Sequence, residues 1–352
     1  MLSREEIHAL PKVILHDHLD GDLRPQTIIE IAKEIGYTEL PTTDVAELTK
    51  WFVDSCSAGS LEKYLRTFDH TIAVMQTREH ITRVSRECVL DLALDNVIYA
   101  EIRVAPEHFT KRGLSLDDVV AAMIAGYNEG VAEAEVMGKK IAVSTILCAM
   151  RHNDRSMEIA ELAIRWRDRG VAGFDIAGAE KGFPASNHKA AFDYLRREGL
   201  PFTIHAGEAD GVASIQDALE NCHAARIGHG VRLADEIRGN ELTPFAREVR
   251  ERGVHLEMAP TSNIQTGVVS DYASHPISAM KKLGFNVGIN TDNRLMSGTS
   301  ASKESFEIAR AHNWGLVDFK EVAESAARAA FATDLTRSQI LNDISAYYAH
   351  LS

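Results

Sequence analysis

The chain has 352 residues, of which 45% are hydrophobic, enough to bury a large core. Its net charge of −13 argues against binding to nucleic acid or to an anionic membrane, because both require a basic surface. No apolar run approaches the length of a membrane span, and the first residues, MLSREEIHALPK, lack the apolar stretch of a signal peptide. We therefore expect a soluble, cytoplasmic protein.

Short β-branched and apolar runs alternate with helical segments from one end of the chain to the other. The predicted strands are Lys12–Asp17, Val97–Ala105, Lys140–Met150, Val171–Ala177, Pro201–His205, Ala225–His229, Val254–Met258 and Asn286–Thr291. This order implies parallel strands joined by crossover helices, and eight such units imply closure into a TIM-type (β/α)8 barrel. We predict one α/β barrel domain over residues 1–352.

The segment between the first two predicted strands is unusually long and holds extra helices. These helices either lie over the barrel mouth as a lid or pack in the outer ring, and the sequence leaves both open. Helical spacing also predicts helices between later strands and at the C-terminus. The predicted helical segments are Leu61–Thr77, Arg78–Asp95, Ser115–Met137, Asp154–Asp168, Phe319–Ala330 and Arg337–His350.

The cysteines show no C-x-x-C spacing, which argues against a redox or zinc motif built from thiols. We interpret them as buried thiols in a reducing compartment. They are Cys56, Cys88, Cys148 and Cys222.

Residues that suit metal binding follow the ends of several predicted strands. In a (β/α)8 barrel, the C-terminal strand ends converge on one rim, and active sites are built there. We therefore expect these residues to meet around one ion. The patches are His16 with His18, His205 with Glu208, His229, and Asp292 with Asn293.

Each patch alone also has an ordinary structural interpretation. Strand alternation puts His16 and His18 on one face, but a short H-x-H motif arises easily by chance. His205 and His229 resemble hydrogen-bonded residues at strand ends, and Asp292 could cap a following helix. An unpaired Asp in an apolar setting is nevertheless costly to bury without a cation. Taken together, the four patches favour a metal site.

Nitrogen and carboxylate ligands suit Zn²⁺ best, although Fe²⁺, Co²⁺ or Ni²⁺ would also fit. Closed structural zinc sites are usually rich in cysteine. A His/Asp site at a barrel mouth is typical of a catalytic metal that keeps one position open for water.

The same motifs, in this order, resemble those of adenosine deaminases in the metal-dependent amidohydrolase superfamily, and they cover almost the full length. The motifs are PKVILHDHLDG at 11–21, GFDIAG at 173–178, HAGE at 205–208, RIGHG at 226–230, PTSN at 260–263 and NTD at 290–292. The resemblance implies that adenosine, and also 2′-deoxyadenosine, is hydrolysed to inosine and ammonia by water activated by one zinc ion.

The resemblance also implies a role for each site residue. Glu208 would protonate the purine ring nitrogen next to the reacting carbon, and His229 would orient the attacking water or take its proton. The backbone N–H of Gly178 would bind a purine nitrogen, and Asp20 would bind a ribose hydroxyl. The implied zinc ligands are His16, His18, His205 and Asp292.

One position departs from the family pattern. The family commonly has a second aspartate after the metal-binding one, whereas this chain has Asn293. The residue here is expected to donate a hydrogen bond to the five-membered ring of the purine. An asparagine amide can always donate, but an aspartate donates only when protonated. The exchange is compatible with purine binding and leaves the exact 6-aminopurine open.

Three alternatives remain at this stage. The same chemistry could act on adenine or on a 5′-modified adenosine, although Asp20 favours a nucleoside. A phosphotriesterase-like hydrolase would carry a carboxylated lysine on the fourth strand, and Phe174–Gly178 has none. An inactive barrel that only binds nucleosides would have lost Glu208 or a metal ligand. The expected partner is a small-molecule purine nucleoside, and the oligomeric state is open.

Overall fold

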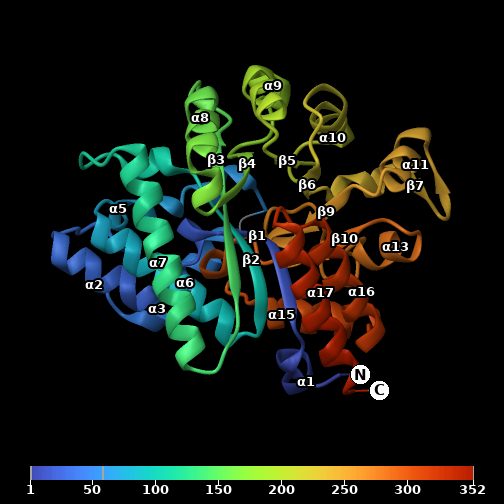
Figure 1. The fold of residues 1–352 in the computed structure, drawn as a ribbon, viewed down its shortest axis with the longest axis horizontal. Helices are drawn as coiled ribbons and strands as arrows, with labels where there is room; N and C mark the ends of the chain where they lie inside the picture. Colours follow the sequence, from blue (N-terminus) through green and yellow to red (C-terminus); the bar gives the residue numbers. More distant parts are fainter. Residues whose placement is uncertain (1, 58, 352) are drawn as a thin grey trace.

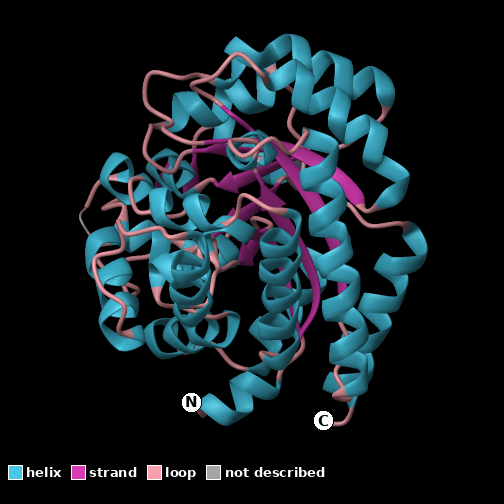
Figure 2. Ribbon diagram, turned by 90° about the vertical axis from the view of Figure 1, so that its left-hand side faces the viewer, coloured by secondary structure: helices cyan, strands magenta, loops and turns pink. Residues whose placement is uncertain are grey.

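The computed structural model describes residues 2–57 and 59–351. Its central strands run parallel and are surrounded by helices (Figures 1 and 2). The parallel strands are β1 (Lys12–His18), β2 (Val97–Val104), β3 (Ala142–Met150), β4 (Val171–Ala177), β5 (Thr203–Ala206), β6 (Arg226–His229), β9 (His255–Met258) and β10 (Val287–Ile289). A two-stranded antiparallel hairpin, β7 (Ile237–Arg238) with β8 (Glu241–Leu242), lies outside this set.

Two four-stranded sheets make up the barrel, in the orders β1-β2-β3-β4 and β10-β9-β6-β5. Single bridges join them at both edges, Asp17 with Asp292 and Phe174 with Phe202. The parallel order and the two closing bridges confirm the predicted α/β barrel. Predicted strand boundaries differ from the observed ones by only a few residues, as in Asn286–Thr291, where β10 covers Val287–Ile289.

Helices fill the crossovers and the C-terminal region (Figure 1). Early helices are α1 (Arg4–Ala9), α2 (Pro25–Ile35), α3 (Val45–Cys56), α4 (Leu61–Leu65), α5 (Phe68–Val74), α6 (Arg78–Leu94), α7 (Leu116–Val136) and α8 (Ser156–Trp166). Later helices are α9 (Lys189–Glu198), α10 (Val212–Gln216), α11 (Pro244–Glu251), α12 (Pro260–Gln265), α13 (Ile277–Lys282), α14 (Arg294–Ser297), α15 (Ala301–His312), α16 (Leu316–Ala329) and α17 (Asp334–Ala349). Among the described residues, no helix has the length and apolar character needed to cross a membrane.

The long first crossover holds α2 to α6, as the sequence indicates. The predicted segment Leu61–Thr77 is divided into α4 and α5, with Arg66 and Thr67 between them. The Thr67 hydroxyl donates to the carbonyl of Tyr64 at 2.7 Å, and the Thr67 side chain is buried. This local side-chain bond offers the backbone an alternative to a continuous helix.

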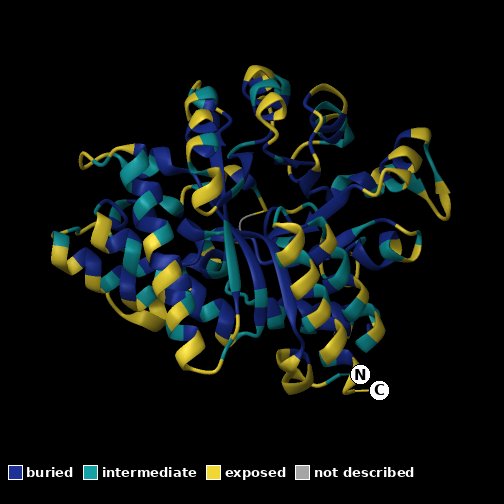
Figure 3. Ribbon diagram, viewed as in Figure 1, coloured by how far each residue is buried: buried dark blue, intermediate teal, exposed yellow. Residues whose placement is uncertain are grey.

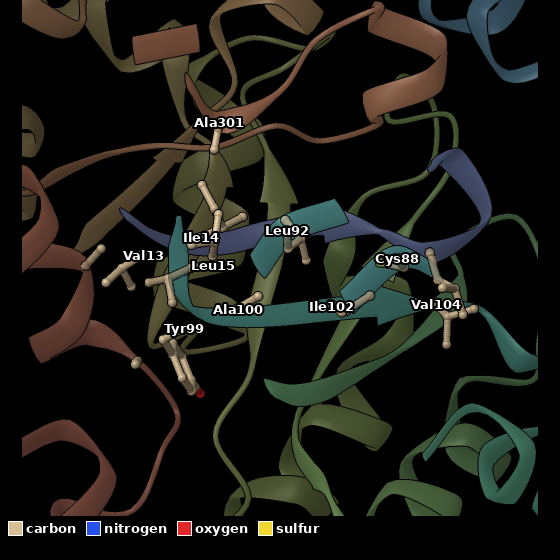
Figure 4. Packing of buried hydrophobic residues seen from close by; sticks show 14 of the residues in the cluster. Val13, Ile14, Leu15, Cys88, Leu92, Tyr99, Ala100, Ile102, Val104 and Ala301 are labelled. Carbon is tan, nitrogen blue, oxygen red and sulfur yellow. The ribbon is translucent and has the colours of Figure 1, made fainter. Parts of the chain in front are cut away.

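The core between the barrel and its helices is apolar and close-packed, and exposed residues lie on the outer helix faces (Figure 3). Cys88 and Leu92 of α6 lie beside Ile14 and Ile102 of β1 and β2 (Figure 4). α7 packs closely against α6 at Gly126. A Cβ added at Gly126 would lie 2.2 Å from a backbone oxygen of α6, so a larger residue would prevent this approach. All four cysteines are buried and free, as predicted.

Candidate active site

A cavity of about 210 Å³ opens at the C-terminal ends of the barrel strands. Its wall includes every residue predicted for the site except His16, which is fully buried next to it. The predicted residues on the wall are His18, Asp20, Gly178, His205, Glu208, His229, Asp292 and Asn293. Barrel geometry therefore brings together side chains that are far apart in the sequence.

Four potential ligands meet at this cavity: His16 and His18 from β1, His205 from β5 and Asp292 after β10. Their ligand atoms lie within 4.8 Å of one another. The Nε2 atoms of His18 and His205 are 3.2 Å apart. Asp292 Oδ1 lies 3.3 Å from His16 Nε2 and 3.5 Å from His18 Nε2. Atoms bonded to one tetrahedral ion at about 2.0–2.1 Å have separations of this size.

Two buried carboxylates orient the imidazoles toward a cation. Glu257 Oε2 accepts from His16 Nδ1 at 3.1 Å, and Asp175 Oδ2 lies 2.8 Å from His205 Nδ1. Each carboxylate keeps the ring proton on Nδ1, so the Nε2 lone pairs of both rings face the carboxylate of Asp292. His16 Nε2 is buried and has no hydrogen-bond partner among the described residues. Lone pairs and a carboxylate that converge in this way fit a bound metal ion.

Buried arginines hold these two carboxylates in place. Arg103 Nη1 donates to Asp175 at 2.6 Å and Arg103 Nη2 donates to Glu257 at 2.8 Å. Arg226 donates to Glu257 at 2.7 Å and to Glu101 at 2.5 Å. Burial disfavours the charge on Glu257, but the neighbouring Arg103 and Arg226 outweigh it and hold the pKa of Glu257 well below its ordinary value. Glu257 therefore stays ionised as an acceptor for His16.

Backbone conformation is unusual at two site residues. His229 (φ 60°) and Asp292 (φ 58°) adopt left-handed conformations that are rare for residues with a side chain. The backbone of Asp292 also bonds to β1: its N–H donates to the His16 carbonyl at 2.9 Å, and its carbonyl accepts from His18 at 2.7 Å. Such conformations persist only where the surroundings fix them, and they cluster at functional sites.

Glu208 follows β5 on a turn that begins at Gly207, whose φ is +68°. One buried carboxylate, that of Glu180, accepts from consecutive backbone N–H groups of this turn. The donors and distances are Gly207 at 2.6 Å, Glu208 at 3.1 Å, Ala209 at 2.6 Å and Asp210 at 2.8 Å. Backbone donors wrapped around an anion form a nest, which here fixes the turn that carries Glu208.

The surroundings of Glu208 favour its neutral form. Burial raises the pKa of this carboxyl well above its ordinary value, and the charges of Asp292 and Glu180 raise it further against the opposing effect of Arg151. Glu208 Oε2 lies 3.7 Å from Nε2 of His229. Burial also lowers the pKa of His229 well below its ordinary value. The surroundings therefore favour a protonated Glu208 beside a neutral His229, next to the four potential ligands.

The remaining predicted residues stand elsewhere on the cavity wall. Asp20 Oδ1 and Asn293 Oδ1 are buried and have no hydrogen-bond partner among the described side chains and backbone. A Cβ at Gly21 would lie 2.0 Å from Asn293 Oδ1, so only glycine leaves room there. Gly178 has a φ of +100°, and a Cβ added there would lie 3.0 Å from Cε of Met150. Buried polar atoms of this kind are ready to bind a polar ligand.

Helices α4 and α5 add an apolar side to the cavity. Their contributions are Leu61, Tyr64, Leu65, Phe68 and Ile72. The first crossover therefore covers the barrel mouth, as one of the two interpretations of the sequence expects. Whether these helices open and close as a lid stays a prediction.

Two further buried carboxylates lie near the potential metal ligands, and the charge of an arginine balances them. Asp17 and Asp22 both accept from the guanidinium of Arg294, with Cys88 beside them. The Asp17 side chain thus points away from the metal ligands, as strand alternation predicts. The guanidinium of Arg294 therefore balances the charge of this cluster.

Sequence reasoning did not identify Arg103, Asp175, Glu180 or Glu257. A signal was present for Arg103 and Glu257, because each is a charged residue inside a mostly apolar predicted strand. Burying such a charge is costly without a partner, so its presence indicates a buried ion pair. Glu180 accepts hydrogen bonds from the turn at residues 207–210. This turn is distant in the sequence, so no local pattern around Glu180 indicates its role.

Comparisons with known proteins show the family of this chain. The sequence model of the family described as "Adenosine deaminase" matches residues 11–347. Adenosine deaminase 1 of Streptomyces coelicolor is 50% identical over 347 residues, covering 97% of this chain and 88% of that protein. Adenosine deaminase of Mycobacterium avium is 47% identical over 352 residues, covering 97% of this chain and 96% of that protein.

Solved structures of deaminases share the fold of this chain at lower sequence identity. The adenine deaminase from Arthrobacter aurescens superimposes with a TM-score of 0.84 at 25% identity, covering 97% of this chain and 100% of that one. The N6-mAMP deaminase of Arabidopsis also has a TM-score of 0.84, at 27% identity, covering 97% of this chain and 99% of that one. With a family model matched from the first strand to the last helix, and relatives near half identity over almost the whole length, the chain belongs to the adenosine deaminase family.

Proposed function

We propose that this protein hydrolyses adenosine, and also 2′-deoxyadenosine, to inosine and ammonia. The observation that carries the proposal is one cavity in which Glu208 and His229 stand 3.7 Å apart beside four converging metal ligands. Relatives that are named adenosine deaminase share 47–50% of their residues with the chain. We propose that the chain forms one barrel domain, acts on a small-molecule nucleoside and works in the cytoplasm.

His16, His18, His205 and Asp292 would hold one Zn²⁺ ion per chain. Three imidazole nitrogens and one carboxylate oxygen are a donor set that zinc prefers, although another divalent transition metal could take the same position. Zinc bound at a site of this kind would lower the pKa of a water molecule towards about 7. Asp175 and Glu257 would keep the two imidazoles that they contact in the tautomer that can bind the ion.

Glu208 supplies the proton that the purine ring needs. Attack on an aromatic carbon becomes easier when the adjacent ring nitrogen is protonated, because the ring can then accept an electron pair. The raised pKa of Glu208 favours the protonated carboxyl, which is the form able to give that proton. The nest around Glu180 holds the turn so that Glu208 faces the cavity.

Other residues would position the substrate. The Gly178 N–H would donate to a purine nitrogen, Asp20 would bind a ribose hydroxyl, and Asn293 would donate to the five-membered ring. The unpartnered buried Oδ1 of Asp20 supports its role, because a carboxylate oxygen accepts from a hydroxyl. The apolar side from α4 and α5 would exclude water from the reacting face.

The test is the change Glu208→Gln. An amide has no proton to give at this position, so turnover of adenosine should fall by about 10²–10⁴, the usual contribution of general acid catalysis. Turnover is followed by the loss of adenosine absorbance and by release of ammonia. Metal content, measured by atomic absorption, should be unchanged.

Glu220→Gln is the matched control, because Glu220 is an exposed carboxyl outside the cavity. It should behave as the wild-type protein does. Wild-type turnover in a fully metal-loaded Glu208→Gln variant would overturn the acid role. A wild-type protein that releases no ammonia from adenosine would overturn the proposed substrate.

A second substrate class has specific support. Structural relatives include an adenine deaminase and an N6-mAMP deaminase, and Asn293 stands where the family pattern has aspartate. Adenine or a 5′-modified adenosine is therefore the alternative, and a panel of 6-aminopurines assayed for ammonia release separates the candidates.

A further inference from the structure

A chain of hydrogen bonds leads away from His229 into the protein. His229 Nδ1 lies 3.1 Å from the amide nitrogen of Asn263, and the Asn263 amide oxygen lies 3.2 Å from Nε2 of His275. The other ring nitrogen of His275, Nδ1, accepts from the backbone N–H of Ile277 at 3.3 Å. Asn263 is 0% exposed, His229 is 1% exposed and His275 is 2% exposed, so bulk water does not compete for these bonds.

The contact between Ile277 and His275 determines which atom donates in each hydrogen bond of this chain. A backbone N–H can only donate, so His275 Nδ1 must carry a lone pair. Burial lowers the pKa of His275 to about 3, so the ring is neutral and its single ring proton sits on Nε2. That Nε2–H donates, which requires the oxygen of Asn263, and not its NH₂ group, to face His275.

The orientation of the Asn263 amide then determines the tautomer of His229. With its oxygen turned to His275, Asn263 presents its NH₂ group to His229 Nδ1. A lone pair on Nδ1 must accept this bond, and the ring proton of His229 therefore sits on Nε2. If His229 Nδ1 were protonated, its N–H would face the NH₂ group of Asn263. Two buried donors would then lack an acceptor, which costs free energy.

We propose that His275 and Asn263 lock His229 in the Nε2–H tautomer, so that His229 acts on the proposed reaction as a hydrogen-bond donor and not as a base. Its Nε2–H faces Glu208 and the cavity, and neither ring nitrogen is free to take a proton. Asn263 and His275 touch no reacting atom and are positioning residues. The inference rests on the proposed function for its catalytic meaning, but the tautomer itself is independent of the substrate.

The decisive measurement is the ¹⁵N spectrum of histidine-labelled, zinc-loaded protein without substrate. Protonated and unprotonated ring nitrogens resonate at well-separated shifts, and the His229 signals are assigned from their loss in His229→Gln. We expect Nε2 protonated and Nδ1 unprotonated in the wild-type protein. The opposite pattern, or two protonated nitrogens, would overturn the inference without any change to Asn263 or His275.

Asn263→Asp should reverse the tautomer of His229 with almost no change in the shape of the side chain. A carboxylate accepts from both neighbours, so His229 must carry its proton on Nδ1 and turn a lone pair to the cavity. The ¹⁵N pattern of His229 should invert, and kcat for adenosine should fall by about 10²-fold, as on removing one preorganised donor. An unchanged His229 pattern in folded Asn263→Asp would overturn the inference.

His275→Gln and His275→Leu form a matched pair. The Gln amide can donate to the Asn263 oxygen and should keep the Nε2–H pattern of His229, whereas Leu cannot donate and should allow a mixture of tautomers. Equal His229 spectra in both variants would count against the inference. If the wild-type protein showed the Nε2–H pattern but did not deaminate adenosine, the tautomer lock would stand and the proposed function would fall.

Discussion

Arg103 lies on β2 with no exposed surface, and its guanidinium donates to both Asp175 and Glu257. Those carboxylates in turn contact His205 and His16, two of the four potential metal ligands. One planar cation thus sets the distance between two carboxylates. Lysine carries the same charge at a single point and cannot donate to both in this forked geometry.

We therefore predict that Arg103→Lys weakens metal binding by about 10- to 100-fold, the usual effect of changing a residue behind the ligands. The affinity is measured by competition with a chelator of known strength. Arg165→Lys is the control, because Arg165 pairs with Asp117 on the surface and is 47% exposed. Equal affinities in the two variants would show that Arg103 does not position the ligands.

Asp20 allows a test at the substrate. Burial raises its pKa to about 7, and its Oδ1 is unpartnered on the cavity wall. If Asp20 binds a ribose hydroxyl, Asp20→Ala should lower kcat/KM for adenosine by about 10- to 100-fold, the value of one hydrogen bond that involves a charged group. Any activity on adenine should be unaffected, because the free base has no ribose. Equal losses on both compounds would exclude the ribose contact.

At the scale of elements, the turn after β5 depends on a residue from the loop after β4. Glu180 gathers four backbone N–H groups of residues 207–210 onto one carboxylate. A glutamine of the same length would present an NH₂ group to some of these donors. Glu180 therefore joins two neighbouring strand ends at the point where Glu208 must be held.

We predict that Glu180→Gln destabilises the protein by about 1–3 kcal/mol, the cost of leaving buried donors unsatisfied. Urea unfolding gives the stability, and hydrogen exchange at residues 207–210 should become faster than in the wild-type protein. Glu220→Gln changes an exposed carboxyl and is the control. Unchanged exchange at these amides would show that the nest does not hold the turn.

Elements with complete local signals could be predicted from the sequence. The helix predicted at Ser115–Met137 is observed as α7, and its Ser115 hydroxyl caps Asp118 while the Asp118 carboxylate accepts from Ser115 in return. The site residues at strand ends could also be placed, because barrel topology alone brings strand ends together. The break between α4 and α5 could not, since Thr67 is buried by contacts with residues such as Met296 that are distant in the sequence.

At the scale of the whole molecule, the candidate metal site lies on the seam that closes the barrel. β1 is the first strand and β10 the last, and they are joined by the single bridge between Asp17 and Asp292 and by the backbone bonds of Asp292 to His16 and His18. The third element, β5, begins the second half of the barrel. An ion bound by all three would therefore fasten the two ends of the chain to each other and to the second sheet.

Metal removal should consequently lower the thermal stability of the entire barrel. A ligand that binds only the folded state adds about 4.1 kcal/mol at a thousand times its Kd, so chelation should lower Tm by several degrees. Scanning calorimetry of metal-loaded and chelated protein measures this, with Asp292→Ala as the comparison, because a weakened site should show a smaller difference. Since the ion spans the first strand, β5 and the last strand, the loss should appear as a shift of one cooperative transition. A chelated protein with the Tm of the loaded one would show that the metal does not hold the seam.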